Sequence, residues 1–307
     1  MIAVTGGRGF AGRAMLAALR AQSWNESGVL SICRGRVINY SDSLQEIGFE
    51  NADLRERLKE AKVFVHTAGA SKGPPDVLWE ANVSVLQRYI DMLPASVEQI
   101  IHFSSVNVLF PELSPYGEAK LKGEQLWAES PFGNRVTVLR PALIYGPGDR
   151  QNIGRLIRLV ERTPIVPVPA SGSMRPVFLK DLVDMVVKLI EQRSYLGQKI
   201  VVSGLEEINF RELVQRLAYQ MHRRRICLPL PDQLLKPLTD AARFCGAKGL
   251  AQTIDGYRLN RPWHDPTIWQ MLDRPATCLD DGLRQCVEYY SRGRFLPGRS
   301  QPGIDLC

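Results

Sequence analysis

The sequence predicts an α/β protein with a doubly wound parallel sheet and a smaller C-terminal lobe. Short apolar runs alternate with stretches of helical periodicity over the first two thirds of the chain, which is typical of a parallel sheet with helices on both faces. The composition then becomes rich in Pro and Gly after Tyr145, which indicates that the chain leaves the sheet. In such sheets ligands bind beyond the carboxyl ends of the strands.

Each expected strand is a short apolar run, and each expected helix lies between two of them. The expected strands are Ile2–Val4, Val29–Cys33, Val63–Ala68, Ile100–Ser104, Val136–Leu139 and Ile200–Ser203. The expected helices begin at Phe10 or cover Leu54–Ala61, Asp76–Leu93, Pro115–Glu129 and Lys180–Gln192. We expect residues 1–145 and 176–204 to form the sheet domain and residues 146–175 and 205–307 the second lobe, with a loose tail over the last fifteen or so residues.

The glycine-rich turn after the first strand predicts nucleotide binding. Gly6, Gly9 and Gly12 lie between a strand and a helix, within the run from Thr5 to Gly12. Glycines let the backbone turn sharply and approach a pyrophosphate, and the helix N-terminus offers free N–H groups and positive potential. The alternative is a glycine-rich turn that serves only the packing of the strand against the helix and binds no ligand.

Composition narrows the class of protein. The net charge is +7, but the basic residues are dispersed apart from Arg223–Arg225, so no nucleic-acid partner is expected. No apolar run approaches the ~20 residues of a membrane span, and Met1 leads straight into a strand, so we expect a cytoplasmic protein without a membrane partner. The six scattered cysteines predict reduced thiols rather than a metal site, and His66 and His102 are expected in the core.

A hydroxyl, a phenol and an amine form the candidate catalytic set. Tyr116 and Lys120 are four residues apart at the start of an expected helix, so they share one face. An ammonium beside the phenol favours the phenolate and suits Tyr116 to general acid–base work. Ser104 and Ser105 end the preceding strand and could hold a substrate oxygen. A Tyr and a Lys at this spacing are common by chance, and the serines and the glycine turn make the combination specific.

With these motifs the sequence resembles the extended short-chain dehydrogenase/reductase family, which contains nucleotide-sugar epimerases and reductases. The resemblance runs from Ile2 to about Gly204 and weakly beyond. It rests on TGGRGFAG, NADL, HTAG, ANVSVL, LRPALIYGPGD, SMRPVFLKDLVD and LDRPATCLDDGLRQCVEYY. It implies a Rossmann-type sheet, a nicotinamide cofactor, and reversible hydride transfer at a carbinol carbon. The helices that hold Asn82 and Tyr116 would pair in a homodimer.

The resemblance assigns roles to individual residues. Tyr116 would exchange the proton, Lys120 would hold the ribose hydroxyls, Ser105 would be the catalytic hydroxyl with Ser104 as the fallback, and Asn82 would lie near the active site. The cofactor-binding residues would be Thr5, Gly6, Arg8, Gly9, Phe10, Gly12, Arg34, Asp53, Leu54, Ala68, Gly69, Ser104, Tyr116, Lys120 and Pro141. The substrate-binding residues would be Ser105, Asn107, Arg150, Asn152 and Arg175.

The end of the second strand favours NADP over NAD. It reads Cys33-Arg34-Gly35-Arg36, with no carboxylate to hold the ribose hydroxyls. Arg34 can fork onto a 2′-phosphate, and Arg8 could approach from the other side. The alternative is that both are solvated surface arginines, in which case NAD remains possible.

We therefore expect an NADP-dependent oxidoreductase that reduces a 4-keto group of a nucleotide-linked sugar. Val106 and Asn107 stand where the family's dehydratases carry an Asp-Glu pair, so dehydration is not expected. Val108-Leu109-Phe110 and a short loop before Tyr116 depart from the epimerase pattern, and Arg175 is one residue out of register with the family's phosphate-contacting arginine. The alternatives are a 4-epimerase with tightly bound NAD and a non-catalytic NADP-sensing protein.

Overall fold

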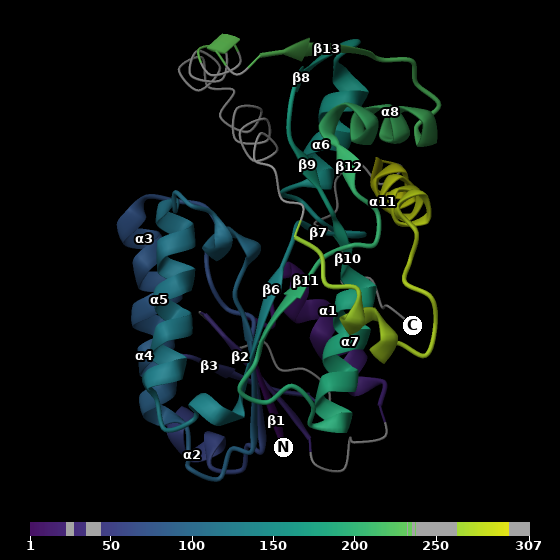
Figure 1. Cartoon of the computed structure of the whole chain (residues 1–307). Helices are drawn as coiled ribbons and strands as arrows, with labels where there is room; N and C mark the ends of the chain where they lie inside the picture. The colour runs from purple at the N-terminus through teal and green to yellow at the C-terminus, as the bar shows by residue number, and fades with distance from the viewer. Residues whose placement is uncertain (23–27, 35–43, 232, 235–236, 238–262, 295–307) are drawn as a thin grey trace. The chain divides into compact units, whose positions relative to one another are not determined.

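The chain divides into two compact units in a computed structural model (Figure 1). The structure describes residues 1–22, 28–34, 44–231, 233–234, 237 and 263–294. The first unit comprises Met1–Pro141, Leu182–Val202 and Thr267–Asp273, and the second Ala142–Asp181, Ser203–Pro266 and Arg274–Cys307. The expected C-terminal tail begins at the end of the last described helix, and residues 295–307 lie outside the described residues.

The first unit is built on a parallel sheet of seven strands. Its strands are β1 (Ile2–Thr5), β2 (Val29–Cys33), β3 (Leu44–Gly48), β4 (Val63–His66), β5 (Gln99–Phe103), β6 (Val136–Pro141) and β11 (Lys199–Val202). They lie in the order β11-β6-β5-β4-β1-β2-β3, and every pair is parallel. The expected fold class is confirmed. The six expected strands are present, and β3 is an additional edge strand that the sequence did not predict.

Helices cover both faces of this sheet, with α3, α4 and α5 on one side and α1 and α7 on the other (Figure 1). The helices of this part of the chain are α1 (Phe10–Arg20), α2 (Leu54–Leu58), α3 (Pro75–Trp79), α4 (Val85–Met92), α5 (Pro115–Glu129) and α7 (Leu179–Gln192). A π-helix, Glu80–Ser84, separates α3 from α4, so the single expected helix over 76–93 has a wider turn at Asn82. A 3-10 turn, Val106–Leu109, precedes α5.

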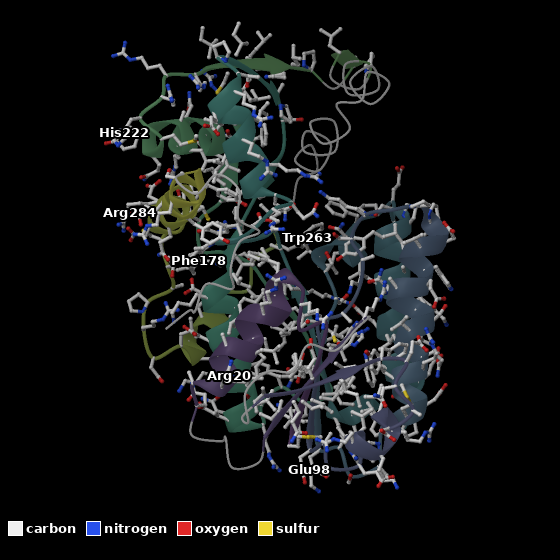
Figure 2. All side chains as sticks on the ribbon, turned by 180° about the vertical axis from the view of Figure 1, so that it is seen from behind. Arg20, Glu98, Phe178, His222, Trp263 and Arg284 are labelled. Carbon is white, nitrogen blue, oxygen red and sulfur yellow. The ribbon has the colours of Figure 1, made fainter. Side chains whose placement is uncertain are left out.

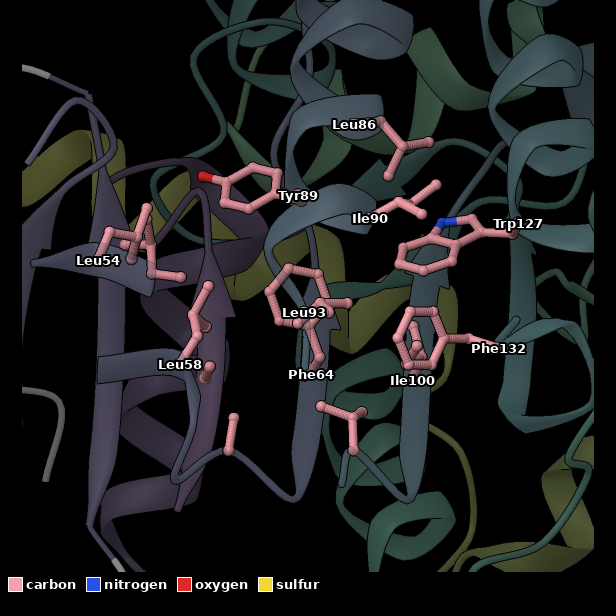
Figure 3. Close-up of a cluster of buried hydrophobic side chains, with 14 of the residues drawn as sticks. Leu54, Leu58, Phe64, Leu86, Tyr89, Ile90, Leu93, Ile100, Trp127 and Phe132 are labelled. Carbon is pink, nitrogen blue, oxygen red and sulfur yellow. The ribbon is translucent and has the colours of Figure 1, made fainter. Parts of the chain in front are cut away.

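A hydrophobic core joins the helices to the sheet in the first unit. Phe64 of β4 and Ile100 of β5 are fully buried and meet Tyr89 and Leu86 of α4 (Figure 3). Trp127 of α5 closes this cluster, with its ring edge-on to Phe64. Aliphatic and aromatic side chains packed at this density fix the position of α5, and α5 carries Tyr116 and Lys120.

The second unit has its own core, around helices and short strand pairs. Its helices are α6 (Ile153–Arg162), α8 (Phe210–Gln220) and α11 (Leu279–Arg294). Its strand pairs are β7 (Ile144–Tyr145) with β10 (Val177–Phe178), β9 (Ser173–Met174) with β12 (Ile208–Asn209), and β8 (Ile165–Pro169) with β13 (Ile226–Leu230). Apolar residues of all three helices are buried together with Tyr145 and Phe178.

Candidate active site

The glycine-rich turn packs against the start of α1. The Gly6 amide donates to Ile32 O at 3.0 Å, and the Gly9 amide donates to Gly6 O at 2.8 Å. A Cβ on Gly12 would lie 2.1 Å from Gly6 O, so only glycine allows the helix to approach this closely. No side chain caps the helix at Gly9, which leaves N–H groups of the first turn for an anionic ligand. Phe10 begins the helix.

The segment after β4 is fastened to β1 next to this turn. Thr5 Oγ1 lies 2.9 Å from His66 Nδ1 and accepts the Ala68 amide at 3.2 Å. Gly69 follows with φ +155°, a conformation that favours glycine. A Cβ there would lie 2.5 Å from Asn82 Oδ1 and 3.2 Å from Lys120 Nζ. Gly69 therefore brings the backbone against two of the expected active-site residues.

Arg8 lies in the glycine turn and is held by a buried carboxylate on β3. Its Nε donates to Glu46 Oε1 at 2.9 Å and its Nη2 to Glu46 Oε2 at 3.0 Å, while the Glu46 side chain is 2% exposed. Arg8 Nη1 also contacts Arg34 O at 3.4 Å. The structure thus brings Arg8 and Arg34 together, and Glu46 is a residue of this site that the sequence did not predict because β3 was missed.

A cavity of about 820 Å³ lies at the carboxyl ends of β2 and β3. It is lined by Arg34, Gly48, Phe49, Glu50, Asn51, Asp76, Val77, Glu80, Ala81, Val85 and Arg88. The Arg88 guanidinium lies 4.5 Å over the Phe49 ring and pairs with Glu50 and Glu80. Arg34 is the expected cofactor residue in this lining.

Asp53 and Leu54 do not belong to that lining. Asp53 is exposed at the start of α2, and its amide donates to Asn51 Oδ1 at 2.8 Å. The Leu54 side chain is buried in the core of the first unit. Because β3 ends at Gly48, the residues directly beyond the strand are Phe49–Asn51, and Asp53 lies one turn of chain further on. The predicted contact of Asp53 with a cofactor stays a prediction.

The expected catalytic residues lie on β5, the following 3-10 turn and α5. Lys120 is buried, and its Nζ donates to Phe103 O at 2.8 Å and lies 6.0 Å from the centre of the Tyr116 ring. Tyr116 is half-buried one turn earlier on the same helix. Ser105 is buried at the start of the 3-10 turn, where its Oγ accepts the Asn107 amide at 3.2 Å. Pro141 is buried at the end of the neighbouring strand β6.

Burial shapes the charge of this set. Desolvation lowers the pKa of Lys120 to about 8, and the negative charge of Glu124 opposes this shift. Asn82 is buried beside it and donates from Nδ2 to Ala70 O and Leu78 O at 2.8 Å each. Asn82 Oδ1 has no hydrogen-bond partner among the described residues. A buried amide oxygen without a donor is unusual and marks a place where a ligand or water is accepted.

Ser104 takes a different role from Ser105. Its hydroxyl donates to Glu124 Oε1 at 2.6 Å, and Arg140 binds the same carboxylate with two bonds of 2.9 and 2.6 Å. Glu124 lies one turn beyond Lys120 on α5. Because this network occupies the Ser104 hydroxyl, the geometry favours Ser105 over Ser104 as the catalytic hydroxyl.

The expected substrate-binding residues are divided between the two units. Asn107 is in the first unit, and its Oδ1 is buried with no hydrogen-bond partner among the described residues. Arg150, Asn152 and Arg175 are in the second unit. Asn152 begins α6, with its amide donating to Asp149, whereas Arg150 is exposed. Arg175 donates to Leu205 O at 2.7 Å and Glu207 Oε2 at 3.1 Å, so a carboxylate already balances its charge.

The remaining expectations for titratable residues can be placed briefly. His66 and His102 are buried and stacked with their ring centres 5.3 Å apart, as expected. Cys33, Cys227, Cys278 and Cys286 are free thiols, and Cys245 and Cys307 lie outside the described residues. Among the described residues no cluster of His, Cys, Asp and Glu could hold a metal ion. No helix in the described part of the chain is long and apolar enough to cross a membrane.

The residues of the first unit fit a dinucleotide. The close approach at Gly12 and the uncapped start of α1 suit a pyrophosphate, and the unpartnered Asn82 Oδ1 is a free acceptor for a ligand or water. This fold and this site define a dinucleotide-dependent enzyme of the doubly wound α/β class. Residues 2–203 match the model of the NAD dependent epimerase/dehydratase family, and the chain belongs to that family.

Comparisons with known proteins agree with this assignment. The chain is 30% identical over 328 residues to a ceramide reductase of Caulobacter vibrioides, covering 97% of this chain and 96% of that protein. It is 28% identical over 264 residues to a UDP-glucose 4-epimerase of Vibrio cholerae, covering 75% and 78%. It superposes on MoeE5 in complex with UDP-glucose and NAD with a TM-score of 0.73 at 23% identity, covering 95% and 99%.

A second solved structure shows the same fold. UDP-glucuronic acid 4-epimerase from Bacillus cereus in complex with NAD superposes with a TM-score of 0.73 at 20% identity, covering 95% of this chain and 98% of that chain. At these identities the likeness establishes the fold. The substrates in the names of these proteins are those of the named proteins, and the shared fold does not assign them to this chain.

Proposed function

We propose that this enzyme is an NADP-dependent reductase that transfers hydride to a ketone, with a 4-keto nucleotide sugar as the first candidate substrate. The observation that carries the proposal is the geometry of Lys120, buried and anchored to Phe103 O next to Tyr116, with Ser105 at the start of the adjoining turn. Val106 and Asn107 follow Ser105 where dehydratases of the family carry an Asp-Glu pair, which supports reduction over dehydration.

The chain's own residues would handle the proton and the oxygen. The bound cofactor supplies the hydride to the carbonyl carbon. The Tyr116 hydroxyl donates a proton to the carbonyl oxygen, which becomes the alcohol, and Ser105 donates a hydrogen bond to the same oxygen. Lys120 stabilises the phenolate that remains on Tyr116 until solvent restores the proton.

The arginine pair supports NADP as the cofactor. Arg34 lines the cavity at the end of β2, where its guanidinium could bind a 2′-phosphate, and Arg8, which is paired with Glu46, donates to the Arg34 carbonyl beside it. The structural relatives described above are complexes with NAD, so the preference needs direct measurement.

A second candidate substrate is a ketone of a ceramide-type lipid. The specific support is the ceramide reductase of Caulobacter vibrioides, which aligns with 97% of this chain. That relative is a reductase, which also favours net reduction over epimerisation. Arg175 pairs with Glu207, so its charge is already balanced. This weakens the expectation that Arg175 binds a phosphate of a sugar nucleotide.

The test is to titrate the purified protein with NADPH and NADH and then follow NADPH oxidation with nucleotide 4-keto sugars and with a keto-ceramide. We expect preferential NADPH binding, lost in Arg34→Ser, and turnover with one ketone class that Tyr116→Phe abolishes. NAD that stays bound through purification, together with interconversion of 4-epimers, would instead establish the epimerase alternative. Turnover that survives in Tyr116→Phe would contradict the mechanism.

A further inference from the structure

The strand pair β8–β13 of the second unit is apolar on both faces. Its ten residues read Ile-Val-Pro-Val-Pro and Ile-Cys-Leu-Pro-Leu, with no polar side chain in either strand. The two strands lie side by side (Figure 1) and are parallel. Ile165 pairs with Ile226, and Val166 pairs with Cys227. Paired residues share a face, so the two faces can be told apart by register.

One face belongs to the core and the other is open. Val166 and Val168 are fully buried in the core of the second unit. On the opposite face Ile165 is 51% exposed, Ile226 66% and Leu228 48%. A strand face that meets water is ordinarily polar, and contiguous exposed apolar side chains mark an interaction site. We call Ile165, Ile226 and Leu228 the apolar face.

Arginines gather where both strands begin. Residues 161–164 and 222–225 lead into the strands, and they contain four arginines and one carboxylate, Glu161. Arg162, Arg223 and Arg224 are exposed, and His222 lies at the same edge of the unit (Figure 2). Arg225 is tied down, because its guanidinium donates to the Val160 and Glu161 carbonyls at the end of α6. The apolar face is therefore bordered by positive charge, and the Arg225 part of it is held in place.

We propose that the apolar face and its bordering arginines dock this enzyme on an anionic lipid bilayer. The aliphatic side chains would enter the boundary between head groups and acyl chains, and Arg162, Arg223 and Arg224 would meet lipid phosphates. The charge favours this partner: lipid phosphates are anionic, whereas a second copy of this chain carries the same net charge of +7. Docking of this kind needs no membrane-spanning helix.

This inference departs from the expectation that the chain has no membrane partner. That expectation rested on the absence of a long apolar run, which excludes a spanning helix but not a peripheral surface. The inference stands apart from the proposed function, because it requires only the second unit's surface. For a lipid-borne ketone it would also place the enzyme where its substrate is.

The test is flotation of the full-length protein with vesicles at low and high salt. The vesicles are phosphatidylcholine alone or phosphatidylcholine with one third phosphatidylglycerol. We expect flotation with the anionic vesicles only, and release at high salt, because exposed charge pairs are screened. Arg223→Ser with Arg224→Ser should weaken binding about 30-fold, since each arginine near an anionic surface contributes about 1 kcal/mol. Ile226→Ser with Leu228→Ser should weaken it at least about tenfold.

Matched controls separate this surface from general charge and hydrophobicity. Lys59→Ser with Lys62→Ser removes two exposed charges from the first unit, and Leu196→Ser removes an exposed apolar side chain there. Both controls should float like the unaltered protein. All variants should keep their NADPH affinity and melting temperature. If Ile226→Ser with Leu228→Ser fails to fold, the arginine variant and the lipid and salt dependence of the unaltered protein still test the proposal.

Three results would overturn the proposal. One is that the unaltered protein stays in the bottom fraction of the gradient with anionic vesicles at low salt. Another is a variant of the apolar face or of its bordering arginines that floats as well as the controls. The third is a dimer in size-exclusion chromatography that Ile226→Ser with Leu228→Ser converts to a monomer, because the face would then be covered by a second copy. A protein that floats but reduces none of the ketones would contradict the proposed function alone.

Discussion

Lys120 is the residue whose chemistry depends most on its surroundings. Its ammonium is buried on α5, donates to Phe103 O, and has the Glu124 carboxylate one turn further along the helix. Burial lowers its pKa to about 8, and Glu124 acts in the opposite direction. In the proposed mechanism the protonated form binds the ribose hydroxyls and favours the Tyr116 phenolate. Lys120 would therefore link cofactor affinity to pH.

We predict that cofactor affinity falls as pH rises through about 8, because Lys120 then loses its proton. Glu124→Gln should move this inflection to lower pH, since it removes the charge that favours the ammonium. The measurement is NADPH fluorescence titration across pH, and Lys120→Met should lose the inflection. The free energy of unfolding should instead rise between about pH 8 and pH 10.5. Over this range the native Lys120 loses its proton, which relieves the cost of burying a charge, while the unfolded chain keeps its proton.

An inflection that does not move in Glu124→Gln would contradict this coupling. Glu124 also binds Ser104 and Arg140, so its removal has a structural cost. Glu124→Gln keeps the shape of the side chain, whereas Glu124→Ala leaves the Arg140 guanidinium without its carboxylate. The alanine variant should lose about 3 kcal/mol of unfolding free energy in urea denaturation.

We predict that Gly69→Ala abolishes turnover. Its Cβ would lie 2.5 Å from Asn82 Oδ1 and 3.2 Å from Lys120 Nζ, at a φ of +155° that side chains rarely adopt. Gly28→Asn is the matched control, because Gly28 also has a positive φ but nothing lies within 4 Å of its Cβ position. The control should keep its activity in a steady-state assay. Equal activity of the two variants would show that the close approach at Gly69 is not needed.

The order of elements was predictable, and one edge of the sheet was not. Apolar runs and glycine punctuation identified six strands, because central strands buried on both faces are almost wholly apolar. β3 reads Leu-Gln-Glu-Ile-Gly, which is weakly apolar, and its carboxylate is buried only because Arg8 of a distant turn neutralises it. The π-helix likewise contains Asn82, whose side chain donates to Ala70 O, a contact that the local sequence does not reveal.

We predict that Glu46→Ala weakens NADPH binding several-fold and leaves NADH binding nearly unchanged. Glu46 holds the Arg8 guanidinium with two bonds, and without it Arg8 must be ordered when a 2′-phosphate binds. The comparison is between the dissociation constants of both cofactors by isothermal titration calorimetry. Lys59→Ala, at an exposed residue outside the cavity lining, serves as the control. An equal loss for both cofactors would mean that Glu46 supports the fold of the turn rather than NADP recognition.

The whole first unit contains a pair of histidines in its core. The rings of His66 on β4 and His102 on β5 are stacked on one another. The His66 ring also contacts Tyr89, and the His102 ring contacts Trp127. Burial lowers the pKa of His66 to about 3 and that of His102 well below its ordinary value. Sequence predicted their burial, but only the structure shows that His66 has a partner in Thr5 while neither ring nitrogen of His102 has one among the described residues.

We predict that unfolding free energy falls as pH drops below about 6.5, since the unfolded histidines take up protons that the native ones refuse. Each histidine contributes about 1.4 kcal/mol per pH unit. His102→Leu should reduce this slope and cost little stability, because it removes a polar ring that makes no hydrogen bond. His66→Leu also reduces the slope but should destabilise the protein, since it breaks the Thr5 contact. Urea denaturation across pH measures both, and identical slopes in His102→Leu and the parent would contradict the assignment.

The neutral histidine pair has a consequence for how the enzyme responds to its environment. Both rings remain uncharged from mildly acidic to alkaline solution, so His66 and His102 neither take up nor release protons in this pH range. With Lys120 as the titrating group, the binding of cofactor should follow one ionisation and show a plateau at neutral pH. The enzyme would then hold its cofactor equally well through the modest acidification of a stressed cell, and respond only to alkalinisation.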